Sequence, residues 1–324
     1  MMDAIRTLPG FDLAFRMVDR LARTRRMKRH FRHARPIEAT PPIVPRHDGV
    51  VILSMIGTAT VLPYLVAVKS FHHHLGMGRV VLLDDGSLTE ADKTLLAHHA
   101  GSPTILRLAD VDRGGCPRGG AWERLLTVLE LRAEDYVIQI DSDTVTLGDM
   151  PEVRAAIAAN DSFILLGGPD AEEKGIQTLP DFVAHVYPHG PVEEPAHIQS
   201  LIESRLAAHP DADRYRYIRG CAGFAGFARG GRNGPADASR FSQIAAKLVG
   251  DAAWTRWGSE QVASNFLLAN EPGARILPYA RYHNYWLEPQ PVDERFVHFV
   301  GTHRYSDDRY IAATDRAIAL LPRG

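Results

Sequence analysis

The chain has 324 residues, of which 45% are hydrophobic and 23% charged, so it can form one large domain or two small ones around a sizeable core. Its net charge of −2 argues against nucleic acid as a partner, and its two distant cysteines, Cys116 and Cys221, argue against a disulfide framework. Because it has no apolar run of about 18 residues and no leader in which basic residues precede apolar ones, we expect no transmembrane helix, no signal peptide and a cytoplasmic location.

Residues 1–33 are predicted to form one basic amphipathic helix. From Arg16 to Arg35 there are nine Lys or Arg and one acid, so this segment carries +8 and the rest of the chain about −10. The helix can pack on the domain or on a second copy of the chain in a homo-oligomer, or lie on an anionic membrane as a peripheral contact. Four prolines follow as a stiff linker, which places the expected boundary between an arm, 1–45, and a domain, 46–324. The apolar positions of the helix are Leu8, Phe11, Phe15, Val18 and Ala22.

Strand and helix patterns alternate through the first half of the domain, which predicts βαβ units and a parallel sheet. The expected strands are the apolar runs at 50–54, 79–83, 104–108 and 136–140. The expected helices are 62–75, 89–100 with Thr89 as its N-cap, and 122–131.

The second half of the domain is less regular. Asp149 and Glu152 form a predicted capping box that opens a helix ending at 160. The residues from 167 to 195 show no clear pattern. The remaining expected elements are strands at 163–166, within 216–228, and at 275–277 and 296–300, and helices at 196–208, 237–250, 259–270 and 307–321.

The two carboxylates of Asp141-Ser-Asp143 directly follow the apolar run 136–140. In extended chain, residues two apart point to the same side, so both carboxylates can face one point. They repel each other unless a positive charge lies between them. Hard divalent cations such as Mn²⁺ or Mg²⁺ prefer oxygen ligands, and the carboxyl ends of parallel strands are where α/β proteins bind ligands. The pattern therefore predicts a metal site at the end of this strand.

The stretch Tyr136–Glu152 resembles the DxD segment of nucleotide-sugar glycosyltransferases with the GT-A fold, an α/β fold with a mostly parallel sheet flanked by helices. It is most similar to the retaining family 8, which includes lipopolysaccharide galactosyltransferases and glycogenin. Three further stretches resemble other elements of that family and occur in the same order: Pro63–Ser70, Glu260–Asn265 and His298–Arg304. Together with the DxD segment they cover roughly residues 50–305.

This resemblance implies a transferase that moves a sugar from a nucleotide diphosphate, expected to be a UDP-sugar, to a glycan or glycolipid acceptor with retention. It implies that Asp141, Asp143 and His298 bind Mn²⁺, or Mg²⁺. An imidazole ligand suits Mn²⁺ better. Without the resemblance, His298 would be read as a core histidine.

The resemblance also implies cations that contact the donor. Arg304 stands where the family has a lysine that binds the diphosphate, and its forked guanidinium suits phosphate oxygens. Arg124 occupies a position that contacts donor sugar and phosphate. Five further residues complete the expected donor contacts: Ser54, Asp84, Ser142, Gly223 and Gly301.

Glu260 and Gln261 match the catalytic element of the family, near the reacting sugar carbon. Ser259 is expected to cap their helix, which places both side chains in its first turn. Alone, Glu260 would be interpreted as an acid that complements the helix dipole. Glu260 and Val262 replace two aspartates of the family's element, and Cys221 replaces an asparagine, which leaves donor specificity and stereochemistry open.

Other functions fit parts of the sequence. Asp84-Asp-Gly-Ser resembles the strand end of inverting family 2 transferases, although a simple turn explains it too. A nucleotidyltransferase would carry a basic glycine-rich loop after the first strand, and Ser54–Thr58 has no cations. A non-catalytic sugar-nucleotide-binding relative is the third alternative, and the retained acids argue against it.

Overall fold

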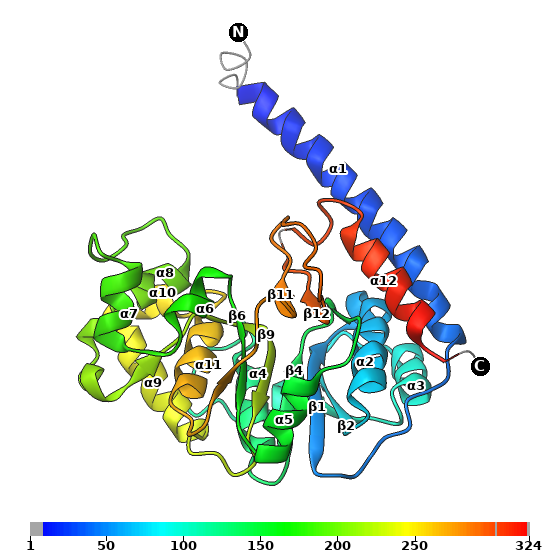
Figure 1. Ribbon diagram of the computed structural model, residues 1–324. Helices are drawn as coiled ribbons and strands as arrows, with labels where there is room; N and C mark the ends of the chain where they lie inside the picture. Colours follow the sequence, from blue (N-terminus) through cyan, green and yellow to red (C-terminus); the bar gives the residue numbers. More distant parts are fainter. Residues whose placement is uncertain (1–8, 302, 323–324) are drawn as a thin grey trace.

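The computed structural model describes residues 9–301 and 303–322, with side chains from Arg20 onward. The expected α/β fold class is confirmed: helices cover both faces of a seven-stranded, mostly parallel sheet (Figure 1). One long N-terminal helix, α1, packs on the outside of this body with its C-terminal part and projects beyond the body with its N-terminal part (Figure 1). Among the described residues, no helix combines the length and the apolar character needed to cross a membrane.

The helices follow one another as α1 (Pro9–Ala34), α2 (Val61–Leu75), α3 (Glu90–His99), α4 (Trp122–Leu131), α5 (Pro151–Ala159), α6 (Asp170–Lys174), α7 (Leu179–Val186), α8 (Ile198–Glu203), α9 (Pro235–Val249), α10 (Asp251–Trp254), α11 (Ser259–Ala269) and α12 (Arg309–Leu320). The strands are β1 (Val50–Ile56), β2 (Arg79–Asp84), β3 (Thr104–Arg107), β4 (Tyr136–Ile140), β5 (Thr144–Thr146), β6 (Phe163–Leu166), β7 (Gln177–Thr178), β8 (Arg216–Tyr217), β9 (Gly220–Phe227), β10 (Arg275–Ile276), β11 (Tyr282–Asn284) and β12 (Phe296–His298).

The main sheet has the order β10-β6-β9-β4-β1-β2-β3, in which β9 alone runs antiparallel to its neighbours. A smaller sheet, β11-β12-β5, is attached where β5 leaves the end of β4. The third, β7-β8, has two strands. Strand β4 therefore lies in the middle of the main sheet and leads directly into the small one.

Alternation along each strand feeds two hydrophobic cores, one on each face of the sheet. In β1, Val50 and Ile52 belong to the core under α2 and α12, whereas Val51 and Leu53 belong to the core under α4 and α11. Burial on both faces explains why these strands are continuously apolar in the sequence. The two cores fix β1 and β4 rigidly, and with them the edge where the site lies.

Helix α1 packs against α12 at the C-terminal end of the chain (Figure 1). His30, Ala34 and Ile37 are fully buried there, and the His30 Nε2 lies 2.9 Å from the Thr314 Oγ1. The part of the arm from His30 onward therefore packs on the domain. Of the apolar positions expected in this helix, Ala22 is half-buried, and four lie outside the described side chains: Leu8, Phe11, Phe15 and Val18.

Most expected elements occur within a few residues of their predicted bounds, and Thr89 caps α3 as expected. The expected helix 196–208 is shorter: α8 ends at Glu203, and a 3-10 turn follows at Leu206–Ala208. The unassigned region contains α6, β7 and α7, and the short strands β5 and β11 were missed. Strands of three residues give too little pattern to be recognised.

Two predicted helix caps are wrong. The carboxylate of Asp149 pairs with Arg154, and that of Glu152 accepts the Tyr282 hydroxyl at 2.8 Å, so neither caps α5. At α11 the cap is Gly258, and the buried Ser259 hydroxyl accepts the Trp122 indole N–H at 2.8 Å. In both cases the side chain that local pattern assigned to the helix backbone binds another side chain instead. The sequence does not mark these partners.

Candidate metal and nucleotide-sugar site

The site begins where the buried strand β4 ends. The Asp141 N–H donates to the Gly223 carbonyl of β9 at 2.9 Å, which ties the end of β4 to its neighbour. The Thr144 hydroxyl donates to the Asp141 carbonyl at 2.9 Å and closes a tight turn. This turn directs the chain into β5, where Thr144 is directly opposite His298 of β12. The turn and this register bring both aspartates to the histidine.

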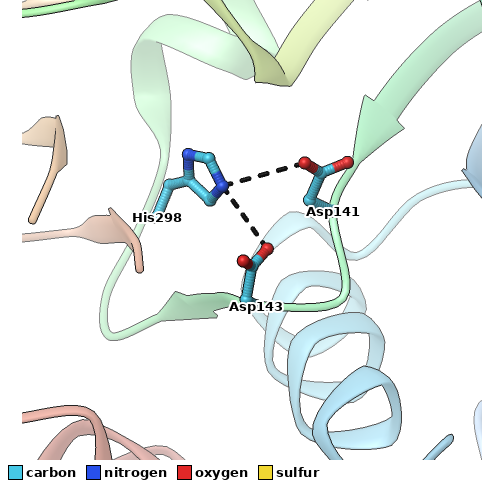
Figure 2. Close-up of side chains that lie close together, drawn as sticks. All are labelled: Asp141, Asp143 and His298. Carbon is cyan, nitrogen blue, oxygen red and sulfur yellow. Dashed lines mark ion pairs between the residues drawn. The ribbon is translucent and has the colours of Figure 1, made fainter. Parts of the chain in front are cut away.

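Asp141, Asp143 and His298 point toward one another (Figure 2). The His298 Nε2 is 3.4 Å from an Asp143 oxygen and 3.7 Å from an Asp141 oxygen. One ligand atom from each residue lies within 4.8 Å of the other two. Asp143 and His298 are buried, while the Asp141 side chain is 29% exposed, so the cluster reaches the surface on the Asp141 side.

Asn284 of β11 fixes the orientation of the imidazole. Its side-chain amide donates to the Leu166 carbonyl at 2.7 Å, which turns the amide oxygen toward the His298 Nδ1, 2.8 Å away. An Nδ1–H donated to this oxygen leaves the lone pair of Nε2 facing the carboxylates. The Cys221 sulfur also contacts Nδ1, at 3.3 Å. Sequence analysis did not identify Asn284, because no pattern in the sequence marks the short strand β11.

Gly223 allows β9 to pass directly against His298. A Cβ atom at this position would overlap the imidazole ring. The glycine expected among the donor contacts therefore packs on a metal-ligand candidate, and any side chain there would displace the ring.

Each aspartate is paired with one arginine. The buried Arg124 of α4 donates to Asp141 with its Nη1. Its Nη2 donates to the Glu260 carboxylate at 3.4 Å. Arg304 binds Asp143, and its Nε donates to the Phe299 carbonyl at 3.2 Å. The structure thus brings both predicted donor-binding arginines to the cluster: Arg124 lies 17 residues before Asp141, and Arg304 lies 161 residues after Asp143.

The charges of the cluster shift the pKa values of its members. Burial opposes ionisation of Asp143, yet His298 and Arg304 hold its pKa below the usual value. Burial alone would lower the pKa of His298, but the neighbouring Cys221 and Asp143 raise it well above its usual value. Burial, opposed by Arg124 and aided by Asp141, raises the pKa of Glu260 to about 7. Asp143 is therefore held as a carboxylate, and the surroundings favour positive charge at His298.

Gln261 is held by a chain of hydrogen bonds that the sequence did not reveal. Its side-chain oxygen accepts the Ala222 N–H at 3.2 Å, and its NH₂ group donates to the Gln199 oxygen at 3.0 Å. Gln199 donates in turn to the buried Glu203 carboxylate at 2.9 Å. Because a carboxylate only accepts, the chain fixes the direction of both amides. Gln199 and Glu203 lie in α8, about 60 residues before Gln261, with no local signal.

The remaining predicted donor contacts are placed differently. The Ser54 side chain is fully buried in the middle of β1, which argues against a donor contact. One Asp84 oxygen accepts the N–H groups of Gly86 and Leu88 at 2.8 and 3.2 Å, so Asp84 closes the turn after β2. Ser142 is half-buried between the two aspartates.

Gly301 lies in the loop after β12, which also carries Arg304. Its carbonyl accepts from the Arg23 guanidinium of α1. A Cβ atom at position 301 would be 4.0 Å from the Arg304 guanidinium. The glycine thus lies beside the expected phosphate-binding cation, and its carbonyl faces the N-terminal helix.

The residues present fit a divalent metal. Two carboxylates and an imidazole with its second nitrogen hydrogen-bonded to an amide are a donor set of the kind that Mn²⁺ and related ions take. The carboxylates favour positive charge at this point, and a divalent ion can supply it in place of a proton on the His298 Nε2. Asp141, Asp143 and His298 would hold the ion, with the exposed side of Asp141 open to a ligand.

No model of a protein family and no curated protein sequence matches the chain. Fold comparison places the chain among proteins with the GT-A glycosyltransferase fold, as the sequence resemblance had led us to expect. It is similar to the bifunctional glycosyltransferase WbbM, with 13% identity and a TM-score of 0.50 over 87% of this chain. The chain spans 51% of the length of WbbM.

Two further solved structures show lower similarity. One is the galactosyltransferase LgtC in complex with donor and acceptor sugar analogues, with 12% identity and a TM-score of 0.48, covering 85% of this chain and 97% of LgtC. The other is core-mannan synthase A from Aspergillus fumigatus in its Mn/GDP form, with 10% identity and a TM-score of 0.40, covering 87% of each chain.

Proposed function

We propose that this chain is a metal-dependent glycosyltransferase that uses a nucleotide-diphosphate sugar. The observation that carries the proposal is the Asp141–Asp143–His298 cluster at the end of β4, flanked by Arg124 and Arg304. The GT-A fold and the ordered sequence resemblance support it, because the same edge of the sheet is where α/β proteins bind nucleotides.

The cluster is built to receive a diphosphate. A divalent ion, when bound, would neutralise the negative charge that grows on the leaving nucleoside diphosphate. Arg304, next to Asp143, offers a forked cation to the phosphate oxygens. Asn284 keeps the His298 Nε2 directed at the cluster. The imidazole ligand favours Mn²⁺ over Mg²⁺, and by resemblance we assign a UDP-sugar as donor.

The second part of the site faces the sugar in this proposal. Arg124 links Asp141 to Glu260, so Glu260 and the metal-binding residues belong to one constellation. Gln261 presents its amide next to Glu260 at the start of α11. We assign these residues to stabilise the positive character that develops at the sugar carbon, with retention of configuration.

The acceptor in this proposal is a glycan or glycolipid. The described part of α1 exposes several basic side chains, and such a surface suits the negatively charged headgroups of a membrane that carries the acceptor. These exposed basic residues are Arg20, Arg23, Arg25, Lys28 and Arg32.

The donor site is tested by thermal shift of the full chain with UDP-, GDP- and ADP-sugars, with Mn²⁺ or with EDTA. We expect stabilisation by a UDP-sugar that needs Mn²⁺ and disappears in Asp141→Ala and Asp143→Ala. The matched control is Asp213→Ala, which removes an exposed carboxylate on the surface. Equal shifts in wild type and both aspartate variants would refute the site.

A further inference from the structure

The loop that carries Arg304 has local backbone hydrogen bonds and no strand pairing in its described residues. It runs from Val300 to Asp308 between β12 and α12, and the N–H groups of His303 and Arg304 both bond the Val300 carbonyl at 3.0 Å. None of its described residues belongs to a strand. Strand pairing therefore does not fix the backbone on either side of Arg304, and its position depends on side chains that reach the loop. Two come from the end of β11: Trp286 meets the His303 ring edge-on, and the Tyr285 hydroxyl donates to Asp307.

Helix α1 contacts this loop at three points along its length. The Arg23 guanidinium donates to the Gly301 carbonyl, and the Arg26 Nη1 donates to the Tyr305 carbonyl at 3.0 Å. Arg29 forms an ion pair with Asp308. Residues 23, 26 and 29 are spaced by three and so follow one side of the helix. The two carbonyls that they hold lie on either side of Arg304.

A buried contact anchors this side of α1. The His30 ring stacks on Tyr310 of α12 with 3.7 Å between ring centroids and lies 5.8 Å from the Tyr305 ring. Tyr305 in turn lies under the Arg304 guanidinium, 6.0 Å from ring centroid to the guanidinium carbon. Contacts therefore run without a break from α1 through Tyr305 to Arg304.

We infer that α1 is a positioning element for Arg304: Arg23 and Arg26 fix the loop on either side of it, so that its guanidinium is directed toward Asp143 and the diphosphate. This inference rests on the proposed function, because it assigns the arm to the same donor site. The arm thereby acquires a role in donor binding, whatever surface its exposed arginines meet.

The test compares two double variants of the full chain. Arg23→Ala/Arg26→Ala removes both contacts to the loop, whereas Arg25→Ala/Arg32→Ala removes the same charge from exposed positions of the same helix. Amide hydrogen exchange of residues 300–306 is measured without any nucleotide. We expect these amides to exchange about fivefold faster than in the wild type in the first variant and at the wild-type rate in the second. The reason is that hydrogen bonds from charged donors hold the backbone of the loop.

The link to Arg304 is tested by measuring the UDP affinity of the same variants, with UDP titrated into the protein in the presence of Mn²⁺. We expect about fivefold weaker UDP binding in the first variant, with kcat little changed, and partial recovery in Arg23→Lys/Arg26→Lys, which keeps donors at both positions. Unchanged exchange would overturn the inference. Faster exchange with unchanged UDP affinity would also overturn it, because the loop would then not position Arg304. If the wild type binds no nucleotide, the proposed function fails, and exchange alone decides whether α1 holds the loop.

Discussion

The two sides of the proposed site are built on different principles. The metal side consists of Asp141, Asp143, His298 and Arg304, which are charged or chargeable groups from two separate segments, 141–143 and 298–304. The sugar side consists of Arg124, Glu260, Gln261 and Gln199. Arg124 and Glu260 form an ion pair, and the two glutamines are fixed by a directed chain of neutral amides that ends on a buried carboxylate.

This difference teaches what each side can tolerate. Groups held by charge can move together when a cation or a diphosphate changes the balance, because attraction at short range has little directional preference. Groups held by directed amides keep one orientation and transmit any loss along the chain. Substitutions on the metal side should therefore change binding, and substitutions on the sugar side should change turnover.

The largest expected effect is on the metal side. Asp143→Asn keeps the shape of the side chain but removes the charge that faces His298 and Arg304. We expect transferase activity to fall by about 10²–10³-fold, together with loss of Mn²⁺-dependent nucleotide binding. Activity assays and Mn²⁺ titration measure this, and Asp213→Asn is the surface control. Wild-type activity in Asp143→Asn would break the assignment of this side.

The next effect concerns the titration of Glu260 on the sugar side. Its pKa is raised to about 7 by burial, so between its unfolded value, near 4.3, and 7 the folded state binds more protons than the unfolded state. Its contribution to stability is complete below that window and is lost as the pH rises through it. We expect a loss on the order of 3 kcal/mol in the free energy of unfolding from pH 4.5 to 8.

The Glu260→Gln variant isolates this titration. Urea unfolding at several pH values, in EDTA, should show a smaller fall in stability with pH for Glu260→Gln than for the wild type. Parallel curves for the two proteins would show that Glu260 is ionised in the folded state across this range.

A third prediction addresses the residue that orients the metal ligand. Asn284→Ala removes the acceptor of the His298 Nδ1–H, and we expect Mn²⁺ to bind about 10–100-fold more weakly. Asn284→Asp keeps an acceptor oxygen for the Nδ1–H but loses the N–H donor to the Leu166 carbonyl, so its Mn²⁺ affinity should lie between those of the alanine variant and the wild type. Calorimetric titration of Mn²⁺ makes the comparison, and equal affinity in the alanine variant and the wild type would contradict the role.

The smallest effect is expected at the far end of the amide chain. Gln199→Ala leaves the Gln261 NH₂ without its acceptor, so the amide can rotate. We expect kcat to fall about tenfold while the dissociation constant of the donor stays the same. Gln243→Ala, on the surface of α9, is the matched control. A change in donor affinity without a change in kcat would contradict the prediction, because it would assign donor binding, and not turnover, to the sugar side.

The sequence predicted the centre of the fold and the metal side better than the sugar side. The run Tyr136–Ile140 is buried on both faces, so its strand character and the position of Asp141 follow from local pattern. His298 is about 155 residues away, and only the resemblance to a family connected it to the aspartates. The register between β5 and β12, which joins them, involves strands of three residues that carry almost no signal.

The rest depends on tertiary partners that local pattern does not show. Asn284, Gln199 and Glu203 act through side chains that meet only in the fold. The same reason explains the wrong cap at Ser259, whose hydroxyl accepts from Trp122, 137 residues away. Ser54 was expected to end its strand, but the strand continues to Ile56, because the apolar run in the sequence does not mark where it stops.

The contact between His30 and Thr314 joins residues 284 positions apart. During synthesis, α1 leaves the ribosome long before α12, so the part of its buried side that faces α12 must remain unpartnered until nearly the whole described chain has emerged. His298 and Arg304 emerge in the same late interval. Closure of the chain and completion of the proposed catalytic centre would therefore coincide, and a nascent or truncated chain would carry Asp143 without His298 and Arg304, the groups that balance its charge.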